Sequence, residues 1–358
     1  METEADMLDS RQRYETVKKY YGETLQSSSD LRTDACCTSE MLSPRVTEVL
    51  ALINDEIKDK YYGCGSPIPL CIEGMEILDV GCGTGRDCYV MSKLAGEKGF
   101  VRGIDMTENQ TAVAKKYIDE QTAVFGYSRP NVEFILDYIE NLHKHFEEKS
   151  VDVVTSNCVV NLTDDKEIIL RQIHEILKFG GEMYFADIYA DRRVAKEISQ
   201  DPVLRGECLG GALYYRDFER IARKVGFSDP RVVSKRFVNI CNEEIKRMVG
   251  NVNFYSITYR LWKLEGLEEA CEDYGHIATY NGQIPESPFK FELDSGHVFY
   301  KNKPERICGN TALMLSKTRF KRYFEVAGSF DEHFGKFESC SNVERSGNTD
   351  QRGADCCS

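Results

Sequence analysis

Apolar residues along the central part of the chain fall into two alternating patterns. Short continuous apolar runs, typical of buried strands, predict strands at residues 77–80, 101–105, 132–136, 151–156 and 183–186. Apolar residues at helical spacing predict helices at residues 44–60, from residue 86 onward, and at residues 107–126, 165–178 and 218–225. This alternation predicts an α/β fold with a doubly wound, mostly parallel sheet, in which ligands bind outside the carboxyl ends of the strands.

Local signals refine the ends of these elements. Residues 107–110 have the pattern of a capping box, which predicts that the helix after them is capped by a side chain. The two glycines at residues 180–181 are expected to end the helix that precedes them. Residues 231–233 and 237–240 predict two final strands.

The strand–helix alternation stops at about residue 241. Residues 254–262 look strand-like and residues 280–283 carry a hairpin turn signal, so a smaller β-containing unit is expected there. The chain is therefore expected to have four parts: an N-terminal segment (1–70), the α/β domain (71–240), a smaller β-containing C-terminal domain (241–335) and a polar, disordered tail (336–358).

Composition narrows the classes of partner. The chain has 358 residues, a net charge of -13 and a pI near 5.1, and so acidic a surface argues against nucleic acid and anionic membranes as main partners. No apolar run is long enough to span a bilayer, and the acidic start lacks the pattern of a signal peptide, which predicts a cytoplasmic protein. In that compartment the 14 cysteines suggest free thiols, metal ligands or redox chemistry.

The sharpest local motif is a glycine-rich turn between the first predicted strand and the helix after it. The turn reads Leu78-Asp79-Val80-Gly81-Cys82-Gly83-Thr84-Gly85-Arg86, and its glycines allow close approach of the backbone to a ligand. A dinucleotide site needs G-x-G-x-x-G, and Arg86 stands where the last glycine would be. The G-x-G-x-G pattern after an acidic residue instead resembles the first motif of the S-adenosylmethionine-dependent methyltransferases. A nicotinamide enzyme and a glycine turn without a ligand are the alternatives.

This resemblance implies a Rossmann-like methyltransferase domain and a set of cofactor contacts. Asp105 stands about twenty positions after the glycines, where an acidic residue binds ribose hydroxyls. The implied contacts to the methionine end are Asp79, Gly81, Gly83 and Gly85. The implied contacts to the adenine are Met106, Ile139 and Glu140. Gln110 and Asn157, which follows the fourth strand, are further implied contacts of the cofactor. Tyr62 is also an implied contact of the cofactor, and the alternatives are that it contacts the methyl acceptor or is simply a buried aromatic residue.

Four cysteines fall where a methyl acceptor would bind. Cys158 follows the fourth strand and Cys208 follows the fifth, so both are expected over the same edge of the sheet. Cys36 and Cys64 lie ahead of the first strand. With their neighbours these residues resemble the arsenite methyltransferases, and the matching stretches are residues 30–36, 61–65, 81–90, 103–107, 156–162 and 206–214.

The resemblance implies that Cys36, Cys64, Cys158 and Cys208 bind trivalent arsenic, supplied free or as its glutathione conjugate. Arsenic(III) is soft, and soft ions prefer thiolate ligands. Three thiolates leave its lone pair free to attack the methyl group of S-adenosylmethionine. We expect Cys158 and Cys208 to serve every round of methylation, and Cys36 and Cys64 to matter mainly for the first.

Attack by the lone pair formally oxidises arsenic to the pentavalent state. Two neighbouring thiols can return the electrons by forming a disulfide, and a thiol reductant such as thioredoxin or glutathione is then expected to reset the enzyme. The expected products are mono- and dimethylated arsenicals, and the expected role is arsenic detoxification.

The same cysteines allow other interpretations. Zinc is disfavoured because the chain has no C-x-x-C spacing and the four cysteines come from separate loops, so no structural metal is expected. Cys37 is the alternative to Cys36 as the first ligand. Two other functions stay open: methylation of a small organic acceptor, and soft-metal binding without catalysis.

Overall fold

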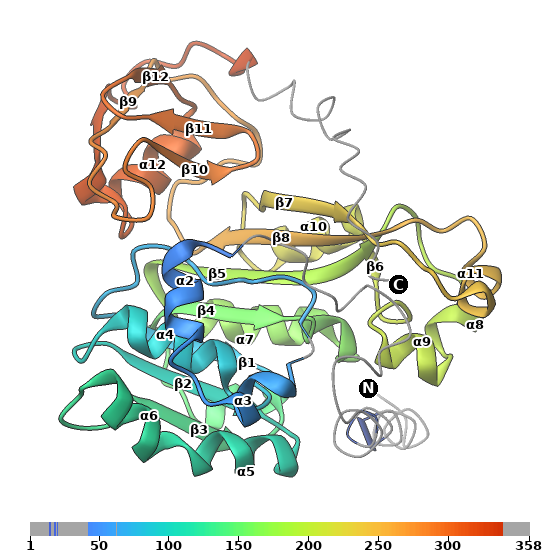
Figure 1. The fold of residues 1–358 in the computed structure, drawn as a ribbon. Helices are drawn as coiled ribbons and strands as arrows, with labels where there is room; N and C mark the ends of the chain where they lie inside the picture. Colours follow the sequence, from blue (N-terminus) through green and yellow to red (C-terminus); the bar gives the residue numbers. More distant parts are fainter. Residues whose placement is uncertain (1–13, 16–17, 19, 21–41, 62, 339–358) are drawn as a thin grey trace.

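The computed structural model describes residues 14–15, 18, 20, 42–61 and 63–338 (Figure 1). A large sheet with helices on both faces forms the body of the molecule, and a smaller C-terminal unit lies at one end of it (Figure 1). The expected disordered tail falls outside the described residues from residue 339 onward. No helix in the described ranges is long and apolar enough to cross a membrane.

The main sheet has the expected doubly wound, mostly parallel form. Its strands run in the order β3-β2-β1-β4-β5-β8-β7, with β6 paired to β5. The first five strands of this path are parallel, whereas β8 is antiparallel to both of its neighbours. The strands are β1 (Glu76–Val80), β2 (Phe100–Asp105), β3 (Val132–Leu136), β4 (Val151–Asn157), β5 (Leu177–Ala190), β6 (Leu213–Tyr214), β7 (Arg231–Phe237) and β8 (Phe254–Trp262).

Two apolar cores hold helices against opposite faces of this sheet. On one face lie α2 (Pro44–Leu50), α3 (Asp55–Asp59), α4 (Arg86–Ala95), α5 (Glu108–Lys116) and α6 (Ile118–Phe125). On the other face lie α7 (Lys166–Ile176) and α10 (Tyr215–Lys224). Neighbouring strand residues divide between the two cores, as Ile77 and Leu78 do, because successive side chains of a strand point to opposite faces.

Short elements complete the loops at the carboxyl end of the sheet. They are the 3-10 helices η3 (Ile139–Lys144) and η4 (Val160–Leu162), and the helices α8 (Lys196–Ser199), α9 (Pro202–Gly206) and α11 (Glu243–Val249). Together with the residues that follow β4, these loops form the edge at which the predicted ligand residues gather.

Some predicted boundaries were wrong. The helix expected over residues 107–126 is broken at Tyr117, whose backbone is not helical and whose hydroxyl bonds Glu56. The side chain of Thr107 makes no capping hydrogen bond to α5, and its backbone N–H donates to the carboxylate of Asp105 at 2.8 Å. The break at Tyr117 thus coincides with a long-range contact, whereas a local bond from the strand end takes the place of the predicted side-chain cap.

The region after α7 also differs from the prediction. The glycines at residues 180–181 do not end a helix; α7 ends at Ile176, and β5 already begins at Leu177. The backbone of Gly180 is left-handed, and the register between β4 and β5 shifts nearby. Glycine is thus needed for an irregularity inside the strand.

The boundary expected at residue 241 was also wrong. Residues 231–237 form one strand, β7, whereas residues 238–240 lie outside it. β8 then returns to the main sheet and pairs with β5 from Ala190↔Phe254 to Glu182↔Trp262. Because β8 supplies the hydrogen-bond partner of β5, the main sheet is complete only at Trp262.

As far as residue 338, the C-terminal unit is built from two small antiparallel sheets, one α-helix and one short 3-10 helix. It contains β9 (Ile277–Tyr280), β10 (Lys290–Asp294), β11 (His297–Tyr300), β12 (Pro304–Arg306), α12 (Gly309–Ser316), η5 (Lys321–Tyr323) and β13 (Phe324–Ala327). The turn expected at residues 280–283 is present, with a left-handed Gly282, but it joins no hairpin because β9 pairs with β12 and β13. Arg319 joins this unit to the sheet by an ion pair with the buried Glu182 at 2.6 Å.

Candidate active site

The glycine turn after β1 adopts a conformation that other residues would strain. Gly81, Gly83 and Gly85 all have left-handed backbones, with φ of 72°, 54° and 81°. A Cβ added to Gly81 would lie 2.2 Å from the side chain of Val159, and one added to Gly85 would lie 2.6 Å from Phe134. The turn is therefore closely packed on one side as well as sharply bent. Because Gly81 and Gly83 have no side chain, their backbone directly lines the neighbouring cavity.

Asp105, at the end of β2, holds this turn. One of its oxygens accepts a hydrogen bond from the backbone N–H of Gly83 at 2.9 Å, and the other accepts one from Thr107 at 2.8 Å. Burial raises the pKa of this carboxyl even though both hydrogen bonds favour its ionised form. Asp105 thus ties the second parallel strand to the glycine turn of the first.

Asp79 lies beneath the turn and is almost fully buried. Its carboxylate accepts a hydrogen bond from the hydroxyl of Thr155 at 2.7 Å and one from the thiol of Cys88 at 3.4 Å. Burial and the nearby charge of Asp87 raise the pKa of Asp79 to about 7. A buried carboxyl in this state is suited to bind an amino group on a ligand.

One cavity brings most of the predicted cofactor residues together. It is lined by Asp79, Gly81, Gly83, Asp105, Met106, Gln110, Ile139, Glu140 and Asn157. Gly85 does not line this cavity, because its α-carbon packs against Phe134. Tyr62 lies outside the described residues.

The cavity has further walls that sequence reasoning missed. The guanidinium of Arg86 lies 3.5 Å from the centre of the ring of Tyr61, and its Nε lies 3.4 Å from Oδ1 of Asp87. Within the described part of the chain, neither of these two buried atoms makes a hydrogen bond. Such atoms fit a ligand with an amino and a carboxylate group, as S-adenosylmethionine has. Their position directly after the glycine turn was the available signal.

Two tyrosines from the start of the chain reach the same region. The hydroxyl of Tyr14, which lines the cavity, donates a hydrogen bond to Glu140. The hydroxyl of Tyr20 donates one to Glu207 at 2.7 Å, beside Cys208. No local pattern predicts these contacts, because the partners are more than a hundred residues apart in sequence.

Asn157, at the end of β4, holds the segment that carries Cys64. Its carbonyl oxygen accepts hydrogen bonds from the backbone N–H groups of Cys64 at 2.9 Å and Gly65 at 3.3 Å. Its amide nitrogen donates to the carbonyl of Gly65 at 2.8 Å and to the hydroxyl of Tyr61. One side chain thus lines the cavity and also positions a predicted arsenic ligand.

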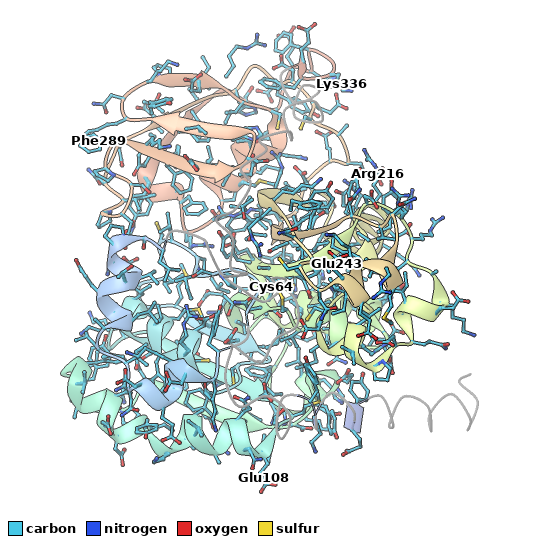
Figure 2. The ribbon with its side chains drawn as sticks, turned by 45° about the vertical axis from the view of Figure 1, so that its right-hand side comes forward. Cys64, Glu108, Arg216, Glu243, Phe289 and Lys336 are labelled. Atoms are coloured by element: carbon cyan, nitrogen blue, oxygen red, sulfur yellow. A yellow bond between two sulfur atoms is a disulfide. The ribbon has the colours of Figure 1, made fainter. Side chains whose placement is uncertain are left out.

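Three of the four predicted cysteine ligands lie together. Cys64 and Cys158 form a disulfide with a Cα–Cα distance of 5.8 Å, and Cys64 lies in the interior of the molecule (Figure 2). The thiol of Cys208 is reduced, buried and 3.4 Å from the carbonyl oxygen of Cys158. Cys36 lies outside the described residues, as does Cys37.

The backbones of Cys158 and Cys208 are both left-handed, with φ of 58° and 62°. Such a conformation costs about 1 kcal/mol or more for a residue with a side chain, so the surroundings must hold it. The N–H of Cys158 donates to the carbonyl of Ala186 at 2.9 Å, and that of Cys208 donates to Arg205 at 3.0 Å. Strain of this kind is concentrated at functional sites.

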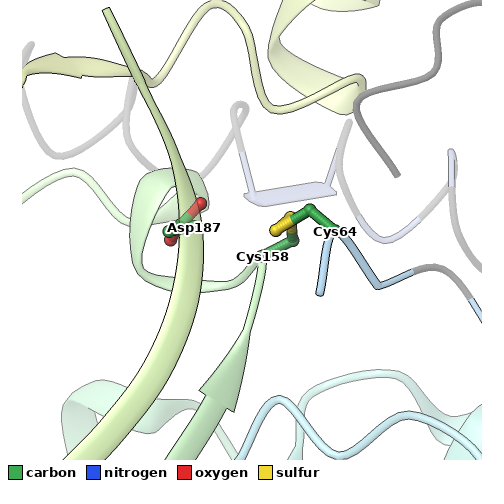
Figure 3. Close-up of side chains that lie close together, drawn as sticks. All are labelled: Cys64, Cys158 and Asp187. Atoms are coloured by element: carbon green, nitrogen blue, oxygen red, sulfur yellow. A yellow bond between two sulfur atoms is a disulfide. The ribbon is translucent and has the colours of Figure 1, made fainter. Parts of the chain in front are cut away.

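Asp187 is a further buried residue beside the disulfide that sequence reasoning missed. It lies on β5, and one of its oxygens is within 4.8 Å of the sulfurs of Cys64 and Cys158 (Figure 3). Its two oxygens accept hydrogen bonds from the backbone N–H groups of Ile188 and Asn161 at 2.8 and 2.9 Å. Burial raises the pKa of Asp187 to about 7 despite these hydrogen bonds.

Comparisons with known proteins agree with this geometry. A family described as a methyltransferase domain matches residues 72–226, and one described as the arsenite methyltransferase C-terminal domain matches residues 275–355. The arsenite methyltransferase of Aquipseudomonas alcaligenes is 47% identical over 91% of this chain and 94% of its own length. That of Homo sapiens is 41% identical over 87% of this chain and 82% of its own length.

A solved structure extends the comparison to the fold. The crystal structure of an arsenic(III) S-adenosylmethionine methyltransferase from Chlamydomonas reinhardtii has a TM-score of 0.81 and 45% sequence identity to this chain. The match covers 83% of this chain and 100% of that one. The fold is therefore that of a class I S-adenosylmethionine-dependent methyltransferase with a small C-terminal unit, and the chain belongs to the arsenite methyltransferase family.

Proposed function

We propose that this enzyme transfers the methyl group of S-adenosylmethionine to trivalent arsenic bound by cysteine thiolates. The proposal rests mainly on one cavity. Its lining includes both the glycine turn, at Gly81 and Gly83, and Cys158, one of the proposed acceptor cysteines. A methyl donor held by the turn and a thiophilic atom held by the cysteines would therefore share one cavity. Proximity of this kind is a main source of rate enhancement in group transfer.

The proposed donor site uses the polar groups already described. Asp79, Arg86 and Asp87 would hold the amino and carboxylate groups of the methionine end, and Asp105 would hold the ribose. Met106, Gln110, Ile139 and Glu140 would surround the adenine, together with Tyr14. When bound, S-adenosylmethionine supplies a sulfonium methyl group that a lone pair on arsenic can attack. The chain's own contribution is to orient this group and to exclude water from it.

The proposed acceptor site consists of Cys64, Cys158 and Cys208, with Cys36 as a further ligand. Three thiolates satisfy the three bonds of arsenic(III) and leave its lone pair free. The left-handed backbones of Cys158 and Cys208 support this role, as does the contact of the Cys208 thiol with the carbonyl oxygen of Cys158 at 3.4 Å. Asn157 would position Cys64 against them.

The disulfide between Cys64 and Cys158 supports a redox step that follows methyl transfer. Methylation raises arsenic formally from the trivalent to the pentavalent state. Oxidation of the two cysteine thiolates to one disulfide returns two electrons to arsenic and leaves a methylated arsenic(III). An external dithiol or two thiols, such as thioredoxin or glutathione, would then reduce the disulfide and restore both thiols.

We further propose that the products are mono- and dimethylated arsenicals, that the reaction serves arsenic detoxification, and that it takes place in the cytoplasm. Reduced thiols are the normal state of cysteine in that compartment. The glutathione conjugate of arsenic(III) is a suitable substrate there, because each enzyme thiol can replace one glutathione. No resident structural metal is part of the proposal.

The test is a direct product analysis. Purified protein is incubated with arsenite, S-adenosylmethionine and thioredoxin or glutathione, and the arsenic species and S-adenosylhomocysteine are separated and quantified. We expect one S-adenosylhomocysteine for each methyl group found on arsenic. Binding of arsenic without any S-adenosylhomocysteine would identify a sequestering protein, and equal rates for wild type and Cys158→Ser would refute the site.

A further inference from the structure

The pair of sulfurs in the acceptor site has a third possible ligand atom beside it. Cys64 comes from the segment before β1, Cys158 follows β4, and Asp187 lies within β5 (Figure 3). Their sulfurs and one carboxylate oxygen all lie within 4.8 Å of one another. All three residues are buried, with exposed fractions of 0%, 2% and 0%. We call this group the Cys64–Cys158–Asp187 cluster.

A carboxylate is the wrong ligand for arsenic but a good one for other cations. Arsenic(III) is satisfied by three soft thiolates, whereas Zn²⁺ and Cd²⁺ accept thiolate sulfur and carboxylate oxygen in the same site. Each oxygen of Asp187 accepts one backbone hydrogen bond, which leaves each oxygen a further lone pair. The cluster therefore offers two sulfurs and one oxygen from a rigid strand and two adjoining loops.

The charges around the cluster suit a divalent cation. A divalent ion with two thiolates and one carboxylate has a net charge of one negative unit. The half-buried Lys166, whose charge acts on Asp187, offsets it, and its amino group is held by the carbonyls of Asn161 and Thr163 at 3.3 and 3.0 Å. Buried charges are tolerated when they are compensated in this way.

We propose that the reduced enzyme binds one divalent thiophilic cation, such as Cd²⁺ or Zn²⁺, at Cys64, Cys158 and Asp187. The fourth ligand would be a water molecule or the thiol of Cys208. The cation binds by displacing one proton from each of the two thiols, and this requires prior reduction of the disulfide. Because the two thiols are also proposed arsenic ligands, the cation would compete with arsenic(III); this competition and the comparison with arsenite affinity rest on the proposed function, whereas cation binding itself does not.

Cadmium titration of the reduced protein tests the site. A water-soluble phosphine reduces the disulfide, with water as the oxygen source for the phosphine oxide, and is removed before Cd²⁺ is added. Thiolate-to-cadmium absorbance measures the affinity, and cadmium NMR identifies a site with mixed sulfur and oxygen ligands. We expect Asp187→Asn to weaken Cd²⁺ binding at this site at least about tenfold, or about 1.4 kcal/mol. Arsenite affinity should change by less than about threefold, because arsenic uses only thiolates.

The decisive quantity is the ratio of the Cd²⁺ and arsenite dissociation constants. A variant that merely disturbs the loop weakens both ligands and leaves the ratio unchanged, which would overturn the proposal. Asp164→Asn is the matched control, because this carboxylate also lies near Lys166 but pairs with Arg205 at 2.6 Å, and it should leave both constants unchanged. Undiminished Cd²⁺ binding at this site in Cys64→Ser would likewise refute it. Methylation of arsenite by wild type is assayed separately. Absence of methylated products there would refute the proposed function, whatever the outcome of the Cd²⁺ titration.

Discussion

The side-chain oxygen of Asn157 accepts a hydrogen bond from the backbone N–H of Cys64 at 2.9 Å. This contact joins the end of β4 to a segment 93 residues earlier in the chain. It brings Cys64 to Cys158, the residue that directly follows Asn157, so that the two sulfurs meet. The same amide lines the proposed cofactor cavity, which makes Asn157 the link between the two halves of the site.

Replacement of Asn157 should therefore impair catalysis more than folding. In Asn157→Ala, the N–H groups of Cys64 and Gly65 lose their acceptor, which costs about 1–3 kcal/mol of stability. Misplacement of Cys64 should lower kcat for arsenite methylation at least about tenfold. Product analysis and thermal unfolding measure the two effects. Asn157→Asp keeps the acceptor and should retain more activity than Asn157→Ala; equal loss in both variants would argue against positioning by this oxygen.

Replacement of single cysteines should distinguish the proposed arsenic ligands from the other cysteines by their effect on the methylation rate. Cys208→Ser leaves Cys64 and Cys158 able to form their disulfide, yet it removes one of the proposed soft ligands, so methylation should fall at least about a hundredfold. Arsenic speciation after a fixed time measures the loss. The control is Cys271→Ser, ahead of β9 and outside the cavity lining, which should keep wild-type rates. Full activity of Cys208→Ser would remove Cys208 from the site.

Two glycines with nearly the same φ provide a matched test of the proposed cofactor turn. Gly81 and Gly126 have φ of 72° and 76°, but a Cβ would lie 2.2 Å from Val159 only at Gly81, and at Gly126 it meets nothing within 4 Å. Both alanine variants bear the strain of a left-handed backbone, about 1 kcal/mol. Gly81→Ala should also raise the KM for S-adenosylmethionine at least about tenfold, because the turn must shift. A similar KM in the two variants would contradict a donor site at this turn.

The contact between the C-terminal unit and β7 should depend on pH. His297 lies 2.7 Å from Asp294, which pairs with Arg231 of β7 at 3.2 Å. Burial alone would lower the pKa of His297, but hydrogen bonds to Asp294 and Cys308 outweigh it and raise this pKa to about 9. An unfolded histidine has a pKa of about 6.5, so the stabilisation is complete below that pH and is lost as the pH rises through about 9.

Urea unfolding at several pH values between 6 and 10 checks this expectation. The free energy of unfolding of wild type should fall across the range, relative to that of His297→Gln, in which the group cannot titrate. The difference between the two proteins should be largest at the acidic end. Parallel pH profiles of wild type and variant would show that the charge of His297 does not stabilise this contact.

Local patterns were sufficient where the structure is local. The glycine turn from Gly81 to Gly85 and the carboxylate at Asp105 follow one another along a strand, a turn and a helix, so their spacing already predicted that they share a site. By contrast, the capping signal at Thr107 was wrong, because its side chain caps nothing in α5 and its backbone N–H bonds the carboxylate of Asp105. The glycines at residues 180–181 were misread because pairing with neighbouring strands decided their role.

The sequence by itself determined the fold class, the glycine turn after β1 and the positions of the cysteines that follow β4 and β5. Side-chain periodicity and the rule for parallel strand ends depend only on neighbours along the chain. Only the tertiary structure decided that β8 completes the main sheet, that Asp187 faces the sulfurs of Cys64 and Cys158, and that Tyr14 and Tyr61 wall the cavity. Each of these depends on hydrogen bonds and burial between segments far apart in sequence. No local spacing encodes such contacts, since they arise only when the whole sheet is assembled.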